Sequence, residues 1–107
     1  MPKSDFSAWG AAFKRRTIYV APSVFQRIQD QATAADIAIS EQVRRLLAQG
    51  IPPGSDLPGP HTELLWVYLP PALDRRVRSL AHRHGWSLAS TLRRLLGAAL
   101  AERGIRR

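Results

Sequence analysis

The chain has 107 residues, of which 45% are hydrophobic, so it is long enough and apolar enough to form one compact domain. Lys and Arg number 16 against 8 Asp and Glu, and the resulting net charge of +8 points to a polyanionic partner, most commonly nucleic acid. The lack of cysteine excludes disulfides, thiolate nucleophiles and Cys-based zinc sites, and no apolar run approaches the roughly 18 residues that a membrane span needs.

Residues 1–13 form an N-terminal arm with aromatic side chains at near-helical spacing, at Phe6, Trp9 and Phe13. We expect these rings to pack on the rest of the protein or on a neighbouring molecule, because large apolar groups are seldom left clustered in water. The arm contains Asp5 and no unbroken apolar stretch, so we do not expect a secretory signal. Together with the lack of cysteine, this favours a cytoplasmic location.

Residues 14–51 predict one strand followed by two helices. The segment 15–20 is short, β-branched and aromatic, which is typical of a strand. Pro22 stands where the first turn of a helix accepts proline, and Asp36 offers a left-handed end to that helix. A second helix is expected to begin near Ser40, with Ser40 as a cap. The apolar positions that follow helical spacing are Val24, Ile28, Ala32, Val43, Leu46 and Leu47.

The segment 52–62 predicts a stiff linker, because it holds four of the eight prolines of the chain. About ten such residues reach on the order of 30 Å in a polyproline-like state. A helix of about 12 residues is only about 18 Å long. The linker can therefore return the chain from the end of the second helix to the start of another strand.

The part of the chain after the linker repeats the part before it. A shift of 49 residues places 14–51 on 63–100 without a gap, with eight identities among 38 positions. The shift also keeps the apolar positions in phase, at Ile18/Val67, Val20/Leu69, Val24/Leu73, Ile28/Val77, Ile37/Trp86, Ile39/Leu88 and Val43/Leu92.

The second copy, residues 63–107, ends in a basic tail. It predicts a strand at 64–69, a helix that begins at Pro71 and stops at Gly85, and a further helix from near Ser87, with Ser87 as a cap. One strand and two helices cannot bury a core or satisfy the backbone of the strand alone. We therefore expect the two strands to pair as an antiparallel ribbon, with four helices covering one face of it.

This pattern resembles the ribbon-helix-helix superfamily, typified by Arc, MetJ and CopG. The resemblance covers residues 14–103 and rests on a strand, then Pro-x-Val/Leu-x-x-x-Ile/Val, a polar loop and a second apolar helix, found twice in register. The single-chain form is similar to TraY-type accessory proteins of conjugative plasmids. It implies a mostly α fold with a two-stranded antiparallel β-ribbon, in which two β-α-α units of one chain form an intramolecular pseudo-dimer. The monomer is then already a complete ribbon unit.

In this superfamily the ribbon enters the major groove of double-stranded DNA, where a two-stranded ribbon fits. Side chains alternate along a strand, and Ile18 and Val20 must face the core, so Arg15, Thr17 and Tyr19 face outward. The resemblance implies that these three contact bases; Arg15 suits guanine, and Thr17 suits a base edge or a thymine methyl. The alternative is an exposed strand kept soluble by polar residues.

The outward positions of the second strand are Leu64, Trp66 and Tyr68, which are poor hydrogen-bonding groups for base readout. Trp66 and Tyr68 are candidate base contacts through thymine methyls and sugars. The alternative, equally open, is that another part of the protein covers them.

The resemblance also implies phosphate contacts at the start of each second helix, where backbone amides and the helix dipole favour an anion. Glu41 would repel a phosphate in the first copy, so the second copy offers the better clamp and the first copy the better base-reading strand. We therefore expect an asymmetric footprint. The candidate phosphate-contacting residues are Lys14, Arg16, Ser40, Ser87, Ser90 and Thr91.

We expect neither enzymatic activity nor a metal or other cofactor. His82 and His84 lie near a helix end without carboxylates close by in sequence, and no Ser/His/Asp set or glycine-rich phosphate loop is evident. Two roles on DNA remain open: a transcriptional regulator, or an origin-binding accessory factor of conjugative DNA transfer with a relaxase as a further partner. The alternative is a protein-interaction module on the same scaffold, as in antitoxins. Side-by-side assembly of monomers on DNA is left open, and no membrane partner is expected.

Overall fold

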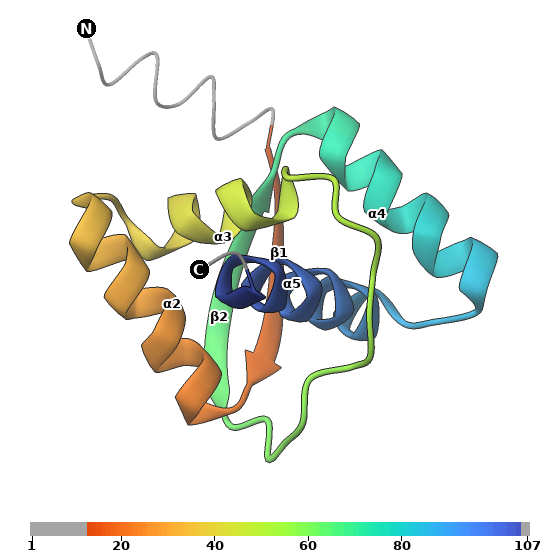
Figure 1. The fold of residues 1–107 in the computed structure, drawn as a ribbon. Coiled ribbons are helices and arrows are strands. Elements are labelled where there is room, and N and C mark those ends of the chain that lie inside the picture. Colours follow the sequence, from red (N-terminus) through yellow and green to blue (C-terminus); the bar gives the residue numbers. More distant parts are fainter. Residues whose placement is uncertain (1–12, 106–107) are drawn as a thin grey trace, which may run out of the picture.

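The computed structural model describes residues 13–105, and these form a mostly helical structure with a two-stranded antiparallel sheet and four helices (Figure 1). Phe6 and Trp9 of the N-terminal arm lie outside the described residues, as do Arg106 and Arg107 of the basic tail; Phe13 is half-buried just before the first strand. The elements follow the chain as β1 (Lys14–Val20), α2 (Pro22–Ala35), α3 (Ile39–Leu47), β2 (Glu63–Leu69), α4 (Pro71–His84) and α5 (Leu88–Ile105).

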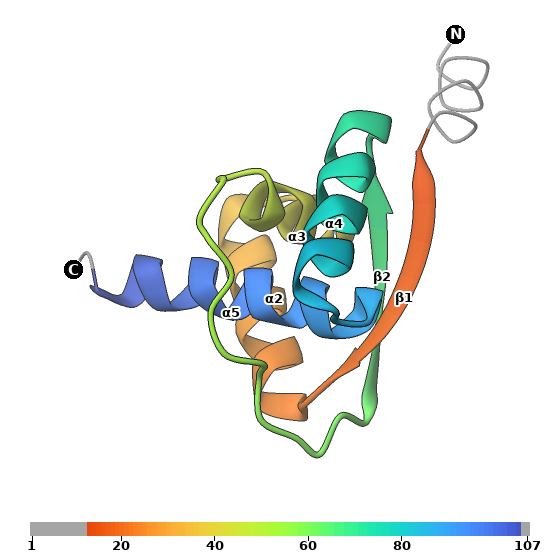
Figure 2. The same cartoon turned by 90° about the vertical axis from the view of Figure 1, so that its right-hand side faces the viewer.

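Exposed and buried side chains alternate along β1 from Thr17 onward and along β2 from Leu64 onward. Ile18 and Val20 of β1 are buried, as are Leu65, Val67 and Leu69 of β2. The helices cover this side of the ribbon only, and Figure 2 shows the ribbon along one side of the molecule with the helices behind it. The predicted inward face of both strands is confirmed.

Proline and left-handed residues mark the ends of the first helix in each half, as predicted. Pro22 and Pro71 occupy the first turns of α2 and α4, where a missing backbone N–H costs nothing. Asp36 ends α2 with φ of 59° and Gly85 ends α4 with φ of 71°. Glycine adopts this conformation without the steric penalty that aspartate incurs, so Gly85 is the better stop.

The core lies between the ribbon and the helices. It is built almost entirely from aliphatic side chains, because the alternating strand positions and the helical stripes meet there. The fully buried large side chains are Ile18, Ile28, Leu46, Leu65, Leu69, Leu92 and Leu96, with Val20, Val43, Val67, Val77 and Thr91.

The linker between α3 and β2 crosses α5 and packs against it (Figure 2). The Gly54 backbone N–H donates to the Arg94 carbonyl at 3.2 Å. The side chain of Leu57 rests on Gly97, where an added Cβ would stand 2.9 Å from a Leu57 methyl. The sequence predicted a stiff connection, and the structure adds that this connection is a packed part of the domain.

Candidate nucleic-acid interface

Six side chains form the outer face of the ribbon, three from each strand. This outer face consists of Arg15, Thr17, Tyr19, Leu64, Trp66 and Tyr68, and all six are exposed. The strands are in a register that places Thr17 opposite Trp66 at the centre of the face. The predicted outward positions are therefore confirmed for both strands. No described segment covers the exposed apolar side chains, which keep between 36% and 52% of their area accessible.

Arg15 and Trp66 contact each other across the ribbon. The Arg15 guanidinium carbon lies 5.1 Å from the centre of the Trp66 ring, which is within the range of a cation–π interaction. Thr17 is directly opposite Trp66, so the contact runs diagonally between neighbouring cross-strand pairs. The polar and the aromatic strand thus form one continuous surface.

Arg16 belongs to the other side of the ribbon, which corrects its placement as a phosphate contact. Its side chain faces the helices and makes a two-point ion pair with Asp74 of α4, with Nε–Oδ1 at 2.9 Å and Nη2–Oδ2 at 3.1 Å. Arg78 also donates to Asp74, at 3.1 Å. The Arg16 guanidinium is the main reason that the pKa of Asp74 is lowered from 3.8, against the opposing effect of burial. Lys14 is exposed at the start of β1 and stays a candidate for a phosphate contact.

Sequence reasoning missed Asp74, although a signal for it existed. Arg16 falls in the inward phase of β1 together with Ile18 and Val20. A charged residue in that phase needs a partner, because burying an unpaired charge is costly. The partner lies 58 residues away, so only the folded chain identifies it.

The N-terminus of α5 has the predicted serine cap. The Ser90 backbone N–H donates to Ser87 Oγ at 3.0 Å, and Ser87 is exposed. Thr91 is fully buried, and its hydroxyl donates to the Ser87 carbonyl at 2.8 Å. Its hydroxyl is thus engaged within the helix, and the expectation that Thr91 contacts a phosphate is wrong. Ser87 is exposed and stays a candidate for such a contact.

The carboxylate of Asp56, in the linker, is bound by side chains from the first two turns of α5. Ser90 Oγ donates to Asp56 at 3.1 Å, and Arg93 donates to both Asp56 oxygens, at 2.7 and 3.0 Å. The Arg93 hydrogen bond is the largest cause of the lowered pKa of Asp56. Ser90 therefore already serves an anion from within the chain, and a phosphate would have to displace it.

The N-terminus of α3 differs from that of α5. Its N-cap is Ala38, which has no side chain that can cap, and Ser40 lies within the first turn without a capping hydrogen bond. The expectation that Ser40 caps the helix is wrong, because the cap falls two residues earlier. Glu41 forms ion pairs with Arg44 at 3.4 Å and with Arg45 at 3.1 Å, so its charge is partly neutralised.

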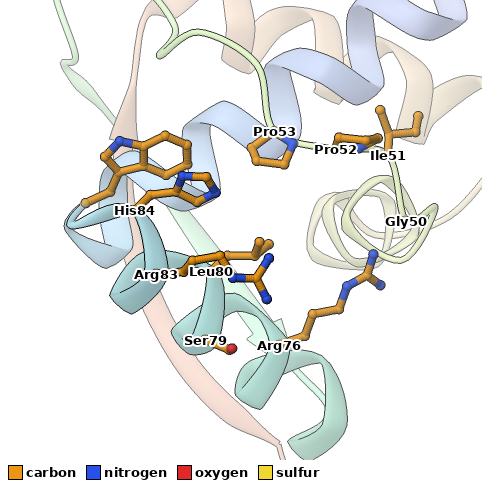
Figure 3. Close-up of a pocket in the computed structure, with 10 residues that line it drawn as sticks. Gly50, Ile51, Pro52, Pro53, Arg76, Ser79, Leu80, Arg83 and His84 are labelled. Carbon is orange, nitrogen blue, oxygen red and sulfur yellow. The ribbon is translucent and has the colours of Figure 1, made fainter.

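A groove of about 570 Å³ lies between the start of the linker and α4, away from the strands (Figure 3). The apolar side chains of Pro52, Pro53 and Leu80 line it, together with the arginines Arg76 and Arg83. Trp86 and His84 also line the groove, and their rings stack with centroids 4.2 Å apart. The guanidinium carbon of Arg94 lies 4.0 Å from the centre of the Trp86 ring. No residue of β1 or β2 lines the groove.

Within the part of the chain that the structure describes, no cluster of three His, Asp or Glu side chains could hold a metal ion. Over the same range, none of the helices has the length and apolarity to cross a membrane. Comparison with known proteins finds no matching family model, no matching curated protein and no matching solved structure.

Proposed function

We propose that the chain is a single-chain ribbon-helix-helix protein in which two β-α-α units form a pseudo-dimer. The strand register supports this most directly. Thr17 pairs with Trp66, which is its counterpart 49 residues along the chain. The neighbouring pairs on this face are Arg15 with Tyr68 and Leu64 with Tyr19. If each residue of the first pair is replaced by its counterpart 49 positions away, the result is the second pair. This is the register that a two-fold axis through the central pair would produce.

The bounds of the elements support the same proposal. The shift of 49 residues carries β1 onto β2 and α2 onto α4 residue for residue, and it carries the start of α3 onto the start of α5. It also superposes the left-handed ends at Asp36 and Gly85. Corresponding backbone hydrogen bonds follow, from Ile37 to Ala32 and from Trp86 to Ala81, both at 3.0 Å.

We further propose that this protein binds double-stranded DNA by inserting the ribbon into the major groove. The observation that carries the proposal is the outer face of the ribbon, a free two-stranded surface of the width that this groove admits. Arg15 and Thr17 stand on it as candidate hydrogen-bonding contacts to bases, and Tyr19, Trp66 and Tyr68 as larger contacts. The net charge of +8 supplies the general attraction to phosphates.

The two halves of this surface differ, which favours a target site without palindromic symmetry. Hydrogen-bonding groups come mainly from β1, whereas β2 offers Leu64, Trp66 and Tyr68. The α5 end has the Ser87 cap for a phosphate, and the α3 end lacks one. Ser40 and Lys14 stay candidate phosphate contacts on the side of the first unit.

Two cytoplasmic roles fit DNA binding of this kind: a transcriptional regulator, or an accessory factor at an origin of conjugative transfer that works with a relaxase. Footprinting of the purified protein on its own genomic locus tests both, with random duplex as competitor. Protection of a divergent promoter supports regulation, and protection beside a relaxase gene supports transfer. The absence of any protected site would overturn sequence-specific binding.

A second candidate function is a protein-interaction module, such as an antitoxin-like scaffold. One observation favours it: four large apolar or aromatic side chains, Tyr19, Leu64, Trp66 and Tyr68, are exposed together on the ribbon. Under this alternative, binding to any duplex would be weak and would lack sequence preference. The footprinting experiment therefore separates the two functions.

A further inference from the structure

The ion pair between Arg16 and Asp74 joins the strand of one β-α-α unit to the first helix of the other. Asp74 is 1% exposed, and Arg16 meets both of its oxygens. Arg78, on the same helix as Asp74, adds a more exposed contact. The pair is thus a charged contact on the side of the ribbon that faces the helices, with Asp74 buried and Arg16 partly exposed.

The counterparts of these two residues, 49 positions away, are both apolar. Leu65 stands in β2 where Arg16 stands in β1, and Phe25 stands in α2 where Asp74 stands in α4. Leu65 is 1% exposed, and Phe25 packs against the core. The strand and helix positions are therefore charged at one junction, and the corresponding two positions at the other junction are apolar.

This difference affects which units can pair. If the first units of two chains paired with each other, Arg16 of each copy would face Phe25 of the other. If the second units paired, Leu65 of each copy would face Asp74 of the other. Each arrangement removes the two-point ion pair of the monomer. Arg16, whose side chain is only 28% exposed, then has no carboxylate beside it, and the nearly buried Asp74 keeps only the more exposed contact with Arg78. Both changes are unfavourable.

We infer that Arg16 and Asp74 determine pairing specificity: they select the pairing of the two unlike units of one chain and reject a second copy of this chain as a partner. The linker adds to this by keeping the unlike units at high effective concentration. The ion pair determines which units fit each other, whereas the linker keeps the two units of one chain close together. The inference rests on the two-unit interpretation proposed above and is independent of DNA binding.

The test exchanges the residues at the two helix positions in the full chain. In Phe25→Asp/Asp74→Phe, pairing of unlike units leaves Arg16 against a phenyl ring and Leu65 against a carboxylate. Pairing of like units instead restores the ion pair twice and the apolar contact twice. Chains refolded together at high concentration should therefore form dimers, measured by light scattering, whereas the unsubstituted chain should stay monomeric.

A cysteine reporter identifies which units have paired. The chain has no cysteine, so Thr17→Cys introduces a single thiol. In the monomer this thiol faces Trp66 and stays reduced. In a pair of like first units, position 17 lies opposite position 17 of the second copy, at a Cα separation of about 5 Å that a disulfide can span. We expect a dimer band under oxidising conditions with the exchanged chain and only a trace with Thr17→Cys alone.

The matched control exchanges the strand positions as well. In Arg16→Leu/Phe25→Asp/Leu65→Arg/Asp74→Phe, unlike units regain the ion pair at the other junction, so this chain should be a monomer again. The two-position exchange could unfold while the four-position control folds as a monomer. The mismatched strand and helix positions would then prevent unlike units from pairing, as inferred. If the two-position exchange stays a monomer and forms no disulfide-linked dimer through position 17, the inference is overturned. Unfolding of both variants would also overturn it, because the two junctions would then not be equivalent.

These results are distinguishable from a failure of the proposed function. Neither light scattering nor crosslinking involves DNA, so loss of the pairing inference leaves the DNA-binding proposal standing. Conversely, a protein that shows the expected pairing but protects no DNA site would support the pairing inference and overturn sequence-specific DNA binding.

Discussion

The guanidinium of Arg15 lies over the ring of Trp66, 5.1 Å from its centre, and so joins the polar strand to the aromatic strand on the outer face of the ribbon. Trp66 restricts where Arg15 can point, in addition to any contact of its own with DNA. A side chain held in place before binding loses less entropy when it binds. The two residues are therefore expected to act together rather than separately.

Arg15→Ala should weaken binding to the cognate site by about 1–3 kcal/mol if Arg15 makes a two-point contact with guanine. The loss on random duplex should be much smaller, since base contacts specify sequence and phosphate contacts position the protein. Combining it with Trp66→Ala should give less than the sum of the single losses, by about 0.5–1 kcal/mol for the cation–π contact. Titration of labelled duplexes measures the affinities of the two single variants and of the double variant.

Leu64→Ala is the control for that cycle, because Leu64 is on the same face but lies opposite Tyr19. The losses of binding free energy caused by Leu64→Ala and Arg15→Ala should be additive in the double variant. If Arg15→Ala leaves cognate binding intact while Trp66→Ala abolishes it, β2 is the base-contacting strand and the assignment to β1 is wrong.

Ser87→Ala should lower the unfolding free energy by about 1 kcal/mol, because it removes the hydroxyl that accepts from the Ser90 N–H. For a domain of this size, that loss corresponds to a decrease in Tm of about 4–8 °C. Ser40→Ala is the matched control, since Ser40 has no capping hydrogen bond. The Tm of this variant should barely differ from that of the unsubstituted protein. Equal decreases in Tm for the two variants would contradict the different capping of α3 and α5.

The ion pair between Asp74 and Arg16 should make stability depend on pH in the acid range. The pKa of Asp74 is lowered from 3.8 in the folded state, so its contribution is fully present well above 3.8 and is lost as the pH falls through the folded value. Asp74→Asn should lower the unfolding free energy by on the order of 3 kcal/mol near pH 7. The difference between the two proteins in urea unfolding should shrink below about pH 4. A difference that stays constant to pH 2 would mean that the charge on Asp74 contributes nothing.

Affinity for duplex DNA should fall steeply with salt, because basic residues that contact phosphates release counterions. Lys14→Ala should reduce the slope of log K against log salt by about 1. Arg45→Ala removes the same charge, but Arg45 is on α3 and paired with Glu41 at 3.1 Å, so its slope should match that of the unsubstituted protein. Binding that is insensitive to salt would instead favour the protein-interaction module.

Local signals in the sequence were sufficient for the elements and for the two faces of the ribbon. Alternation along a strand has a period of two, so Ile18 and Val20 in the core already place Arg15 and Thr17 outside. Proline fixes its own φ angle, and residues that tolerate a left-handed backbone stop helices, so Pro22, Pro71 and Gly85 act within a few residues of chain. None of these properties depends on what the rest of the chain does.

Only the tertiary structure decided which polar groups are free to bind a partner. Arg16 looked like a phosphate contact until the fold brought Asp74 to it, and Ser90 looked free until the linker delivered Asp56. Periodicity shows which side of an element a residue faces, but it contains no information on what lies opposite across 58 or 34 residues of chain. That depends on the pairing of the strands and the path of the linker, because a charged group is satisfied by whichever partner the packed chain places within hydrogen-bond distance.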